Sequence, residues 1–370
     1  MAYTTIDDPS VYHQTEIYTD GDATTDDTTS QTFDGNSDLQ PDWMWFKSRN
    51  VVGNHGHMDT SRGKGGGTSF KTLFMTTADE RTSSSVYDLT AINSDGFSYG
   101  RANQLDWAHG TPAQNTVWAW KANGGTRTTF NESSNNPGGG RQVNTTAGFA
   151  IIDYTGTGGN GTIAHGLPAT PNVVIVKNRD GGNSDSWFTH WTGLLNDNQI
   201  LYWNNTDGAA TNATAFNSTA PGATNITVGT NSGTNKDGDG YIMYAFTDIK
   251  GYSKSGKYVG NGDRDGAFVY TGFKPGWIMI KRTDDDGQNW YIADSARSPL
   301  NLVDNFLSTN TTAVEDTSGD TTDAYFDIYS NGFKLRQDFS HLNASGATHV
   351  FLAFAQKPFV SSEGTPTTAR

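Results

Sequence analysis

The stretch that decides the fold lies in the last third of the chain and reads Pro275-Gly276-Trp277-Ile278-Met279-Ile280-Lys281. A proline stands two residues before a four-residue apolar run, and a lysine ends the run. The run is too short for a helix and is apolar at every position, which is typical of a strand buried on both faces. Proline is tolerated where a strand begins. The stretch therefore predicts a central strand in a sheet that is covered on both sides.

The same pattern occurs twice more, as Pro41-Asp42-Trp43-Met44-Trp45-Phe46-Lys47 and as Pro171-Asn172-Val173-Val174-Ile175-Val176-Lys177. Each copy is followed by a second apolar segment with a central alanine, 78, 74 and 78 residues after the proline. These closing segments are Val117-Trp118-Ala119-Trp120, Met243-Tyr244-Ala245-Phe246 and Phe351-Leu352-Ala353-Phe354. A spacing shared by three copies indicates three homologous units, each with two central strands that we expect to pair.

Turn-forming sequences rich in Gly, Asn and Asp divide the rest of the chain into short segments. This pattern predicts an all-β fold of three tandem β-sandwich repeat domains of a jelly-roll-like type. The predicted boundaries are 1–125 for the first unit, 147–252 for the second unit and 253–360 for the third unit. We expect a Gly- and Asn-rich linker at 126–146 and a flexible tail at 361–370.

Composition excludes several classes of function. The net charge of -14 over 370 residues repels a phosphate backbone, so nucleic acid is not an expected partner. With no cysteine in the chain, disulfides, thiolate catalysis and Cys-ligated zinc are excluded. No run approaches the ~20 apolar residues of a membrane span, and the first residues lack the plan of a secretion signal. We therefore expect neither membrane insertion nor Sec export.

A catalytic interpretation would start from a group of titratable residues in the first unit: His55, His57, Asp59 and Arg62. At the equivalent place in the third unit, Asp294 and Arg297 recur while both histidines are replaced. A pair kept between units is better explained as a structural contact than as a catalytic one. The chain also lacks a Gly-x-Ser-x-Gly elbow, a phosphate loop and a His-Glu-x-x-His motif. We therefore expect no enzyme and no cofactor.

Two Asp-rich turns raise the alternative of calcium binding, because hard cations prefer clustered oxygen ligands. The residues concerned are Asp237, Asp239, Asp263 and Asp265. Neither turn continues into a twelve-residue loop ending in Glu, so turn formation is the preferred interpretation.

Aromatic residues in polar surroundings are candidates for contact with sugars or partner proteins, because exposed ring faces are common binding platforms. The candidate residues are Trp107, Trp187, Trp191, Tyr202, Trp203 and Trp290. We expect most Trp side chains to lie in the cores nonetheless, since small sandwiches need large residues to fill them. The Trp residues expected in the core from the strand pattern are Trp43, Trp45, Trp118, Trp120 and Trp277.

Several motifs together resemble a family of repeat-containing virion proteins common in marine tailed bacteriophages. They are the opening residues 1–10, the Tyr154-Thr155-Gly156 step, the Pro-led strands that end in lysine, and Gly251-Tyr252-Ser253-Lys254. The resemblance covers nearly the whole chain, from Met1 to Val360. The first unit departs from the family at Asp20-Gly21-Asp22 and in the acidic stretch 24–30, where a shorter turn is usual. The family pattern supplies no catalytic residues.

The resemblance implies a non-enzymatic protein on the exterior surface of a virion, assembled in the host cytoplasm. Its expected role is that of a tail fibre or receptor-binding component that contacts the host surface through multivalent weak contacts. The alternatives are a capsid decoration or head-fibre protein and, from the enzyme class, a polysaccharide depolymerase. The expected partners are other virion proteins and a host-surface glycan or protein, and by analogy with phage fibres we expect a homo-oligomer.

Overall fold

The repeated apolar runs form the central strands of three sheets. The computed structural model describes residues 3–19, 28–65, 67, 69–77, 80–81, 89–100, 113–181, 186–316 and 325–367. The Pro-led runs are strands β3 (Trp43–Ser48), β13 (Val173–Asn178) and β21 (Phe273–Arg282). The closing segments are strands β8 (Gln114–Trp120), β18 (Gly240–Phe246) and β26 (Thr348–Pro358). As expected, each closing strand pairs antiparallel with the Pro-led strand of its own unit.

The prediction of an all-β chain is confirmed, because 45% of the described residues are in strands and 3% are helical. In the described part of the chain the helical elements are one-turn pieces: η1 (Pro9–Val11), α1 (Ser232–Asn235) and α2 (Ser340–Asn343). This low helical content follows from a sequence with 43 Gly and with Asp, Asn and Thr spread through the connections.

The main sheets of the units share one strand order, with the edge strand first, the closing strand second and the Pro-led strand third. In the first unit the edge strand is β1, and β4 and β5 complete the sheet. In the second unit the corresponding strands are β11, β14, β15 and β16, and in the third unit they are β19, β22 and β23. Their bounds are β1 His13–Thr19, β4 Gly56–Asp59, β5 Leu73–Phe74, β11 Phe149–Thr155, β14 Trp187–Trp191, β15 Gln199–Tyr202, β16 Ala210–Thr211, β19 Ser253–Val259, β22 Trp290–Asp294 and β23 Leu307–Ser308.

A smaller sheet accompanies each main sheet. The strand orders are β2-β7-β6 in the first unit, β12-β17 in the second and β20-β25-β24 in the third. The bounds are β2 Thr28–Gln31, β6 Leu89–Ile92, β7 Phe97–Gly100, β12 Gly161–Ala164, β17 Asn225–Val228, β20 Phe268–Tyr270, β24 Phe326–Tyr329 and β25 Gly332–Leu335. Side chains of each small sheet join an apolar cluster with one face of the main sheet of the same unit. This arrangement is a sandwich in each unit.

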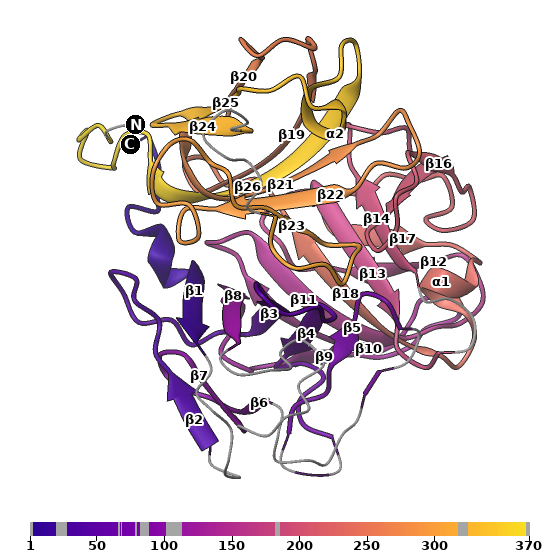
Figure 1. Ribbon diagram of the computed structural model, residues 1–370. Coiled ribbons are helices and arrows are strands. Elements are labelled where there is room, and N and C mark those ends of the chain that lie inside the picture. The colour runs from indigo at the N-terminus through magenta and orange to yellow at the C-terminus, as the bar shows by residue number, and fades with distance from the viewer. Residues whose placement is uncertain are drawn as a thin grey trace.

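The other face of every main sheet packs into one cluster that all units share. Along β3, Trp43 and Trp45 enter this central cluster, whereas Met44 and Phe46 enter the sandwich cluster of the first unit. The strands β13 and β21 alternate in the same way. Both faces of each sheet are thus covered, which is why the Pro-led runs are apolar at every position. The units therefore pack around a common core (Figure 1).

The Trp residues that the strand pattern predicts to be buried lie in this central cluster, at relative exposures of 0% or 1%. The residues are Trp43, Trp45, Trp118, Trp120 and Trp277. The prediction that they are core residues is confirmed.

The segment 126–146 is not only a linker, contrary to its predicted role. It contributes β9 (Thr128–Phe130) and β10 (Gly139–Asn144), which extend the main sheet of the second unit beyond β11. Glycine in this strand is needed because a Cβ on Gly139 would lie 2.0 Å from the carbonyl oxygen of Asp153. The high glycine content that suggests flexibility therefore serves close strand approach instead.

The two ends of the chain lie side by side beside the third unit (Figure 1). The backbone N–H of Ser362 donates to the Asp7 carboxylate at 2.6 Å, so the start of the predicted tail 361–370 is fixed to the N-terminal segment.

Candidate functional site: a groove along strand β1

Of the aromatic residues proposed as contact platforms, those that the structure describes are buried, with one partial exception. Trp187, Trp191, Trp203 and Trp290 have relative exposures of 0% or 1% and belong to the central cluster. Tyr202 is half-buried, and its ring packs 5.1 Å from that of Phe188. Trp107 lies outside the described residues. The interpretation of the four buried Trp residues as surface contacts is therefore wrong, because their rings point into the shared core whatever the polarity of their neighbours in sequence.

These buried rings hold neighbouring units together. Trp187 in the second unit donates its Nε1–H to the carbonyl of Phe74 in the first unit, at 3.3 Å. Trp290 in the third unit donates to the carbonyl of Tyr202 in the second, at 2.9 Å. His55 occupies the equivalent position in the first unit, and its Nε2 bonds the carbonyl of Ser308 in the third at 3.0 Å. One position per unit thus closes each of the three interfaces with a ring N–H.

The lysine that ends each Pro-led run also crosses to the neighbouring unit. The Nζ of Lys47 donates to the carbonyl of Thr312, and that of Lys281 donates to the carbonyl of Thr206. Lys177 reaches the carbonyl of Thr77 at 3.1 Å. Burial lowers the pKa of Lys47 and of Lys281 to about 8, so both ammonium groups depend on these carbonyls for their charged form.

The Asp–Arg contact predicted from the repeats is confirmed in both units. In the first unit Arg62 binds Asp59 at 2.5 Å and Glu80 at 3.1 Å, and Glu80 binds Arg179 of the second unit at 2.8 Å. Burial opposes ionisation of Glu80, but the two guanidinium groups lower the pKa of its carboxyl below the ordinary value. The chain of charges links the first and second units.

An equivalent chain links the third unit to the first. Arg297 binds Asp294 at 2.6 Å and Glu315 at 2.9 Å, and Glu315 binds Arg49 of the first unit at 2.7 Å. The titratable cluster that suggested catalysis is therefore an element of the interfaces between units.

His57 lies at the centre of the aromatic cluster rather than in an accessible site. Its ring is 4.9 Å from that of Trp45 and 4.7 Å from that of Trp187. Neither ring nitrogen has a hydrogen-bond partner among the described residues. Burial holds the pKa of His57 well below the ordinary histidine value, so the ring is neutral at physiological pH.

The four Asp residues considered for calcium separate into two turns, and the oxygens of Asp239, Asp263 and Asp265 have other partners. Asp239 accepts from the amide of Asn178 at 2.8 Å. Asp263 accepts from the backbone N–H of Asp265, which itself binds Lys334 at 2.5 Å. Asp237 is exposed. The described residues contain no group of three or more potential metal ligands. The preferred interpretation of these residues as turn formers agrees with the hydrogen bonds.

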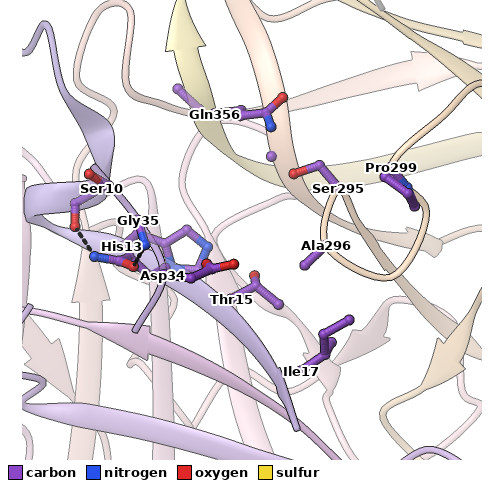
Figure 2. A pocket seen from close by; sticks show the side chains of 13 residues that line it. Ser10, His13, Thr15, Ile17, Asp34, Gly35, Ser295, Ala296, Pro299 and Gln356 are labelled. Atoms are coloured by element: carbon purple, nitrogen blue, oxygen red, sulfur yellow. Dashed lines mark hydrogen bonds between the residues drawn. The ribbon is translucent and has the colours of Figure 1, made fainter. Parts of the chain in front are cut away.

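A groove of about 380 Å³ lies between the first and third units, along the edge of β1 that no described strand covers. Figure 2 shows its two walls facing one another, one built on β1 and the other on the third unit. The first wall comprises Ser10, His13, Gln14, Thr15, Ile17, Asp34 and Gly35, and the second comprises Gly276, Ser295, Ala296, Pro299, Ala355 and Gln356. Sequence analysis missed this groove because one wall comes from residues 10–35 and the other from residues 276–356, far apart in the chain.

Hydrogen bonds fix the β1 wall of the groove. The side chain of Gln14 accepts from the backbone N–H of Gly35 at 2.8 Å and donates to the carbonyls of Ser10 and Ser37 at 2.9 and 2.7 Å. Next to it, Glu16 is half-buried, and burial together with the charge of Asp34 raises the pKa of the Glu16 carboxyl to about 7. The wall is therefore fixed by hydrogen bonds, and Glu16, whose charged form is disfavoured, lies on the same strand between the lining residues Thr15 and Ile17.

A second hollow, of about 370 Å³, lies beside rings that sequence analysis did not select. Tyr270 is 52% exposed and lines this hollow with Tyr3, whose hydroxyl is 3.2 Å from that of Tyr270. Phe268, on the same strand β20, is 47% exposed, whereas Val269 between them is buried. Strand periodicity places the two rings on one face, but only packing decides that this face is the outer one.

The fold and these contacts define a class of protein: an all-β chain whose main sheets have the same strand order and share one aromatic core. The chain belongs to a family described as a domain of unknown function, DUF7483, whose model matches residues 8–358. No curated protein and no solved structure matches the chain significantly. In the described residues no helix has the length and apolarity to cross a membrane.

Proposed function

We propose that the protein is a non-enzymatic structural component of the exterior surface of a bacteriophage virion, in a tail-fibre or receptor-binding position. The proposal is supported by the resemblance of the sequence to repeat-containing virion proteins. The observation that carries it is the placement of the charged groups at the interfaces between units. Arg62, Glu80 and Arg179 join the first unit to the second, and Arg297, Glu315 and Arg49 join the third unit to the first. Groups that could perform chemistry thus serve rigidity, as suits a particle surface.

Contact with the host would use the rings that remain exposed, Phe268 and Tyr270. Each ring supplies a weak contact to a glycan or to a protein, and several copies of the chain on one particle would combine such contacts. This makes a homo-oligomer or a multicopy arrangement part of the proposal.

A capsid decoration or head-fibre protein is the second candidate. The observation that favours it is the burial of Trp187, Trp191, Trp203 and Trp290, which removes most of the proposed ligand platform. In this position the groove along β1 would serve attachment to neighbouring virion proteins, and no host contact would be required.

Cryo-electron microscopy of intact particles tests the proposal directly, with the protein located by a small inserted tag. Density at the distal tail supports host recognition, and density spread over the capsid lattice supports decoration. Absence of the protein from purified particles would overturn both positions. Release of reducing ends from host surface polysaccharide by the purified chain would instead show an enzyme.

A further inference from the structure

The three edge strands β1, β11 and β19 are equivalent, because His13, Phe149 and Ser253 lie opposite Trp120, Phe246 and Phe354 of their closing strands. In each unit the next strand of the same sheet is the closing strand, so the other side of the edge strand is available for pairing. What lies against the outer side of the edge strand differs among the three units.

In the second unit the edge is covered by strand β10. Gln142 lies opposite Ile151 and Asn144 lies opposite Phe149, in antiparallel register. β10 also contacts the first unit, since the amide of Gln142 donates to the hydroxyls of Thr60 and Ser61 at 2.8 and 2.7 Å. An added strand therefore occupies the space between an edge strand and the neighbouring unit.

Asn144 makes a further contact between β10 and the first unit, because its amide donates to the carbonyl of Lys121 at 3.2 Å. We call the surface on which β10 packs its seat. The seat consists of Thr60, Ser61 and Lys121 on one side and of β11 on the other.

In the third unit side chains, not a strand, occupy part of the corresponding edge, beside the second hollow. Asp248 accepts a hydrogen bond from the backbone N–H of Ser255 at 2.7 Å. The hydroxyl of Ser253 donates to the carbonyl of Thr247, which is the equivalent of Lys121. The outward N–H at the centre of β19 therefore has a side-chain partner.

In the first unit the equivalent seat is the groove. Ser295 and Ala296 are the equivalents of Thr60 and Ser61, because Thr60 and Ser295 each donate to the residue that precedes the first Trp of the Pro-led strand. Ala355 is the equivalent of Lys121, one residue after the closing aromatic. All three line the groove opposite β1. The groove is therefore the open counterpart of the seat that β10 fills in the second unit.

The edge of β1 can accept such a strand. The N–H of Lys121 donates to the carbonyl of Tyr12, and in an antiparallel ladder this pairing directs the backbone groups of His13, Thr15 and Ile17 away from β8. These groups face the groove that the side chains of the same residues line. Ile17 is 40% exposed, an apolar side chain on an open strand edge.

Charge indicates what kind of strand fits. In the second unit Arg141 of β10 lies opposite Ile152 of β11, and the β1 residue equivalent to Ile152 is Glu16. The Oε2 of Glu16 is buried with no hydrogen-bond partner in the described protein, and Asp34 adds a second negative charge nearby. A basic side chain at the position of Arg141 would therefore meet two acidic groups.

We propose that the groove between β1 and the third unit binds one extended segment of a partner protein as an added antiparallel strand, with a basic residue opposite Glu16 and a hydrogen-bonding side chain opposite Thr15. The inference goes beyond the virion assignment and does not depend on it, because it rests only on the comparison of the three edges.

The probe is a labelled, end-blocked peptide with the sequence of residues 138–145, Gly-Gly-Gly-Arg-Gln-Val-Asn-Thr, titrated against the full chain by fluorescence anisotropy. We expect saturable binding at one site, with hydrogen-exchange protection of the Thr15 and Ile17 amides. The same peptide with Glu in place of Arg should bind at least about tenfold more weakly, because it brings a like charge to Glu16.

Two matched variants locate the site on the protein. Ile17→Pro removes one outward N–H of β1 and should weaken binding at least about tenfold, while the pairing with β8 is kept. Lys257→Pro makes the same change at the equivalent position of β19, where Asp248 already accepts from the central outward N–H of Ser255, and should leave the affinity unchanged. A thermal melt establishes that both variants are folded.

Three outcomes would overturn the proposal. The wild-type chain does not bind the probe, the charge-reversed peptide binds equally well, or hydrogen-exchange protection is confined to β19. Concentration-dependent self-association of the chain that Ile17→Pro abolishes would also overturn it, because the occupant would then be a second copy. The peptide comparison uses the unmodified protein, so it tests the proposed binding even if Ile17→Pro does not fold.

Discussion

The hydroxyl of Tyr244 in the second unit donates a hydrogen bond of 2.7 Å to Oδ2 of Asp59 in the first unit. At the equivalent place between the first and third units, Trp118 donates from its Nε1 to Oδ2 of Asp294 at 2.9 Å. A buried carboxylate needs such a donor because an unpaired charge in a low-dielectric interior is very costly.

Between the third and second units the two equivalent positions are Leu352 and Trp191, both members of the central apolar cluster. Donor and acceptor have been replaced together by an apolar pair. The core thus tolerates either solution at an interface, provided that no polar group is left without a partner.

Removal of the carboxylate at the first interface should be strongly destabilising. Asp59→Ala leaves the buried Arg62 without its closest counter-ion, and we expect a loss of about 3–5 kcal/mol in the free energy of unfolding. Denaturant unfolding followed by Trp fluorescence measures this loss. Asp153→Ala is the matched control, because its partner Arg127 is partly exposed, and it should cost no more than ~1 kcal/mol. Equal losses would show that burial does not govern these ion pairs.

The full chain should unfold in a single cooperative transition, because one apolar cluster contains side chains of all three units. Calorimetry and Trp fluorescence should therefore give coincident midpoints. Residues 126–252, which include β9 and β10, would expose Trp187 and Trp191 when expressed alone and should be aggregation-prone or unfolded. Three separate transitions, or a stable isolated second unit, would contradict the shared core.

His57→Ile should be tolerated at neutral pH, because Ile292 occupies the equivalent position in the third unit. The pKa of His57 is lowered in the folded state by burial, so the unfolded chain binds the additional proton as the pH falls below about 6.5. The wild type should thus lose stability on acidification relative to the variant. Unfolding free energies at pH 7.5 and 5.5 measure the difference, and a gap that does not widen at the lower pH would argue against a neutral buried ring.

Glu16→Gln should have the opposite pH dependence. The pKa of Glu16 is raised by burial from 4.5 to about 7 in the folded state, so its ionisation destabilises the fold as the pH rises through this range. We expect the variant to be about 1–2 kcal/mol more stable than the wild type at pH 8, after allowance for the partial exposure of this side chain, and equal to it at pH 4. Thermal melts at both pH values provide the measurement. Lower stability of the variant at pH 8 would show that the backbone hydrogen bond from Asp34 to the Glu16 carboxylate outweighs the cost of its burial.

Replacement of the exposed rings should reduce host adsorption without loss of stability. Phe268→Ser combined with Tyr270→Ser removes exposed apolar surface, so the melting temperature should stay within a few degrees of that of the wild type. Particles that carry the double variant should adsorb to host cells more slowly. Leu300→Ser, at a side chain that is 74% exposed, is the control for a general loss of apolar surface. Unchanged adsorption of the double variant would favour the decoration role.

Some features follow from local pattern and could be predicted. Trp43 and Trp277 stand in apolar runs with proline before them and lysine after them, and such runs form buried strands wherever the units are placed. The Asp294 and Arg297 contact was predictable because the same residue pair, three apart, recurs in two units. Repetition within one chain supplied the comparison that a single segment lacks.

Other features depend on contacts that no local pattern encodes. Trp187 and Trp290 have polar neighbours in sequence, but their rings fill the space between units. Strand β10 was hidden in a segment whose glycines resemble those of a flexible linker, although Gly139 is required there for close packing against β11. The groove combines Thr15 with Ser295, which only the packing of the units brings together.

The sequence by itself determined the all-β class, the identity of the central strands and the repetition of one unit, because side-chain periodicity and turn chemistry act over a few residues. The tertiary structure decided that the units share a core, which rings face solvent and which strand edge stays open. Those outcomes depend on which faces meet when the sheets assemble, and that is settled by burial and by hydrogen bonds between residues up to hundreds of positions apart, such as Trp118 and Asp294.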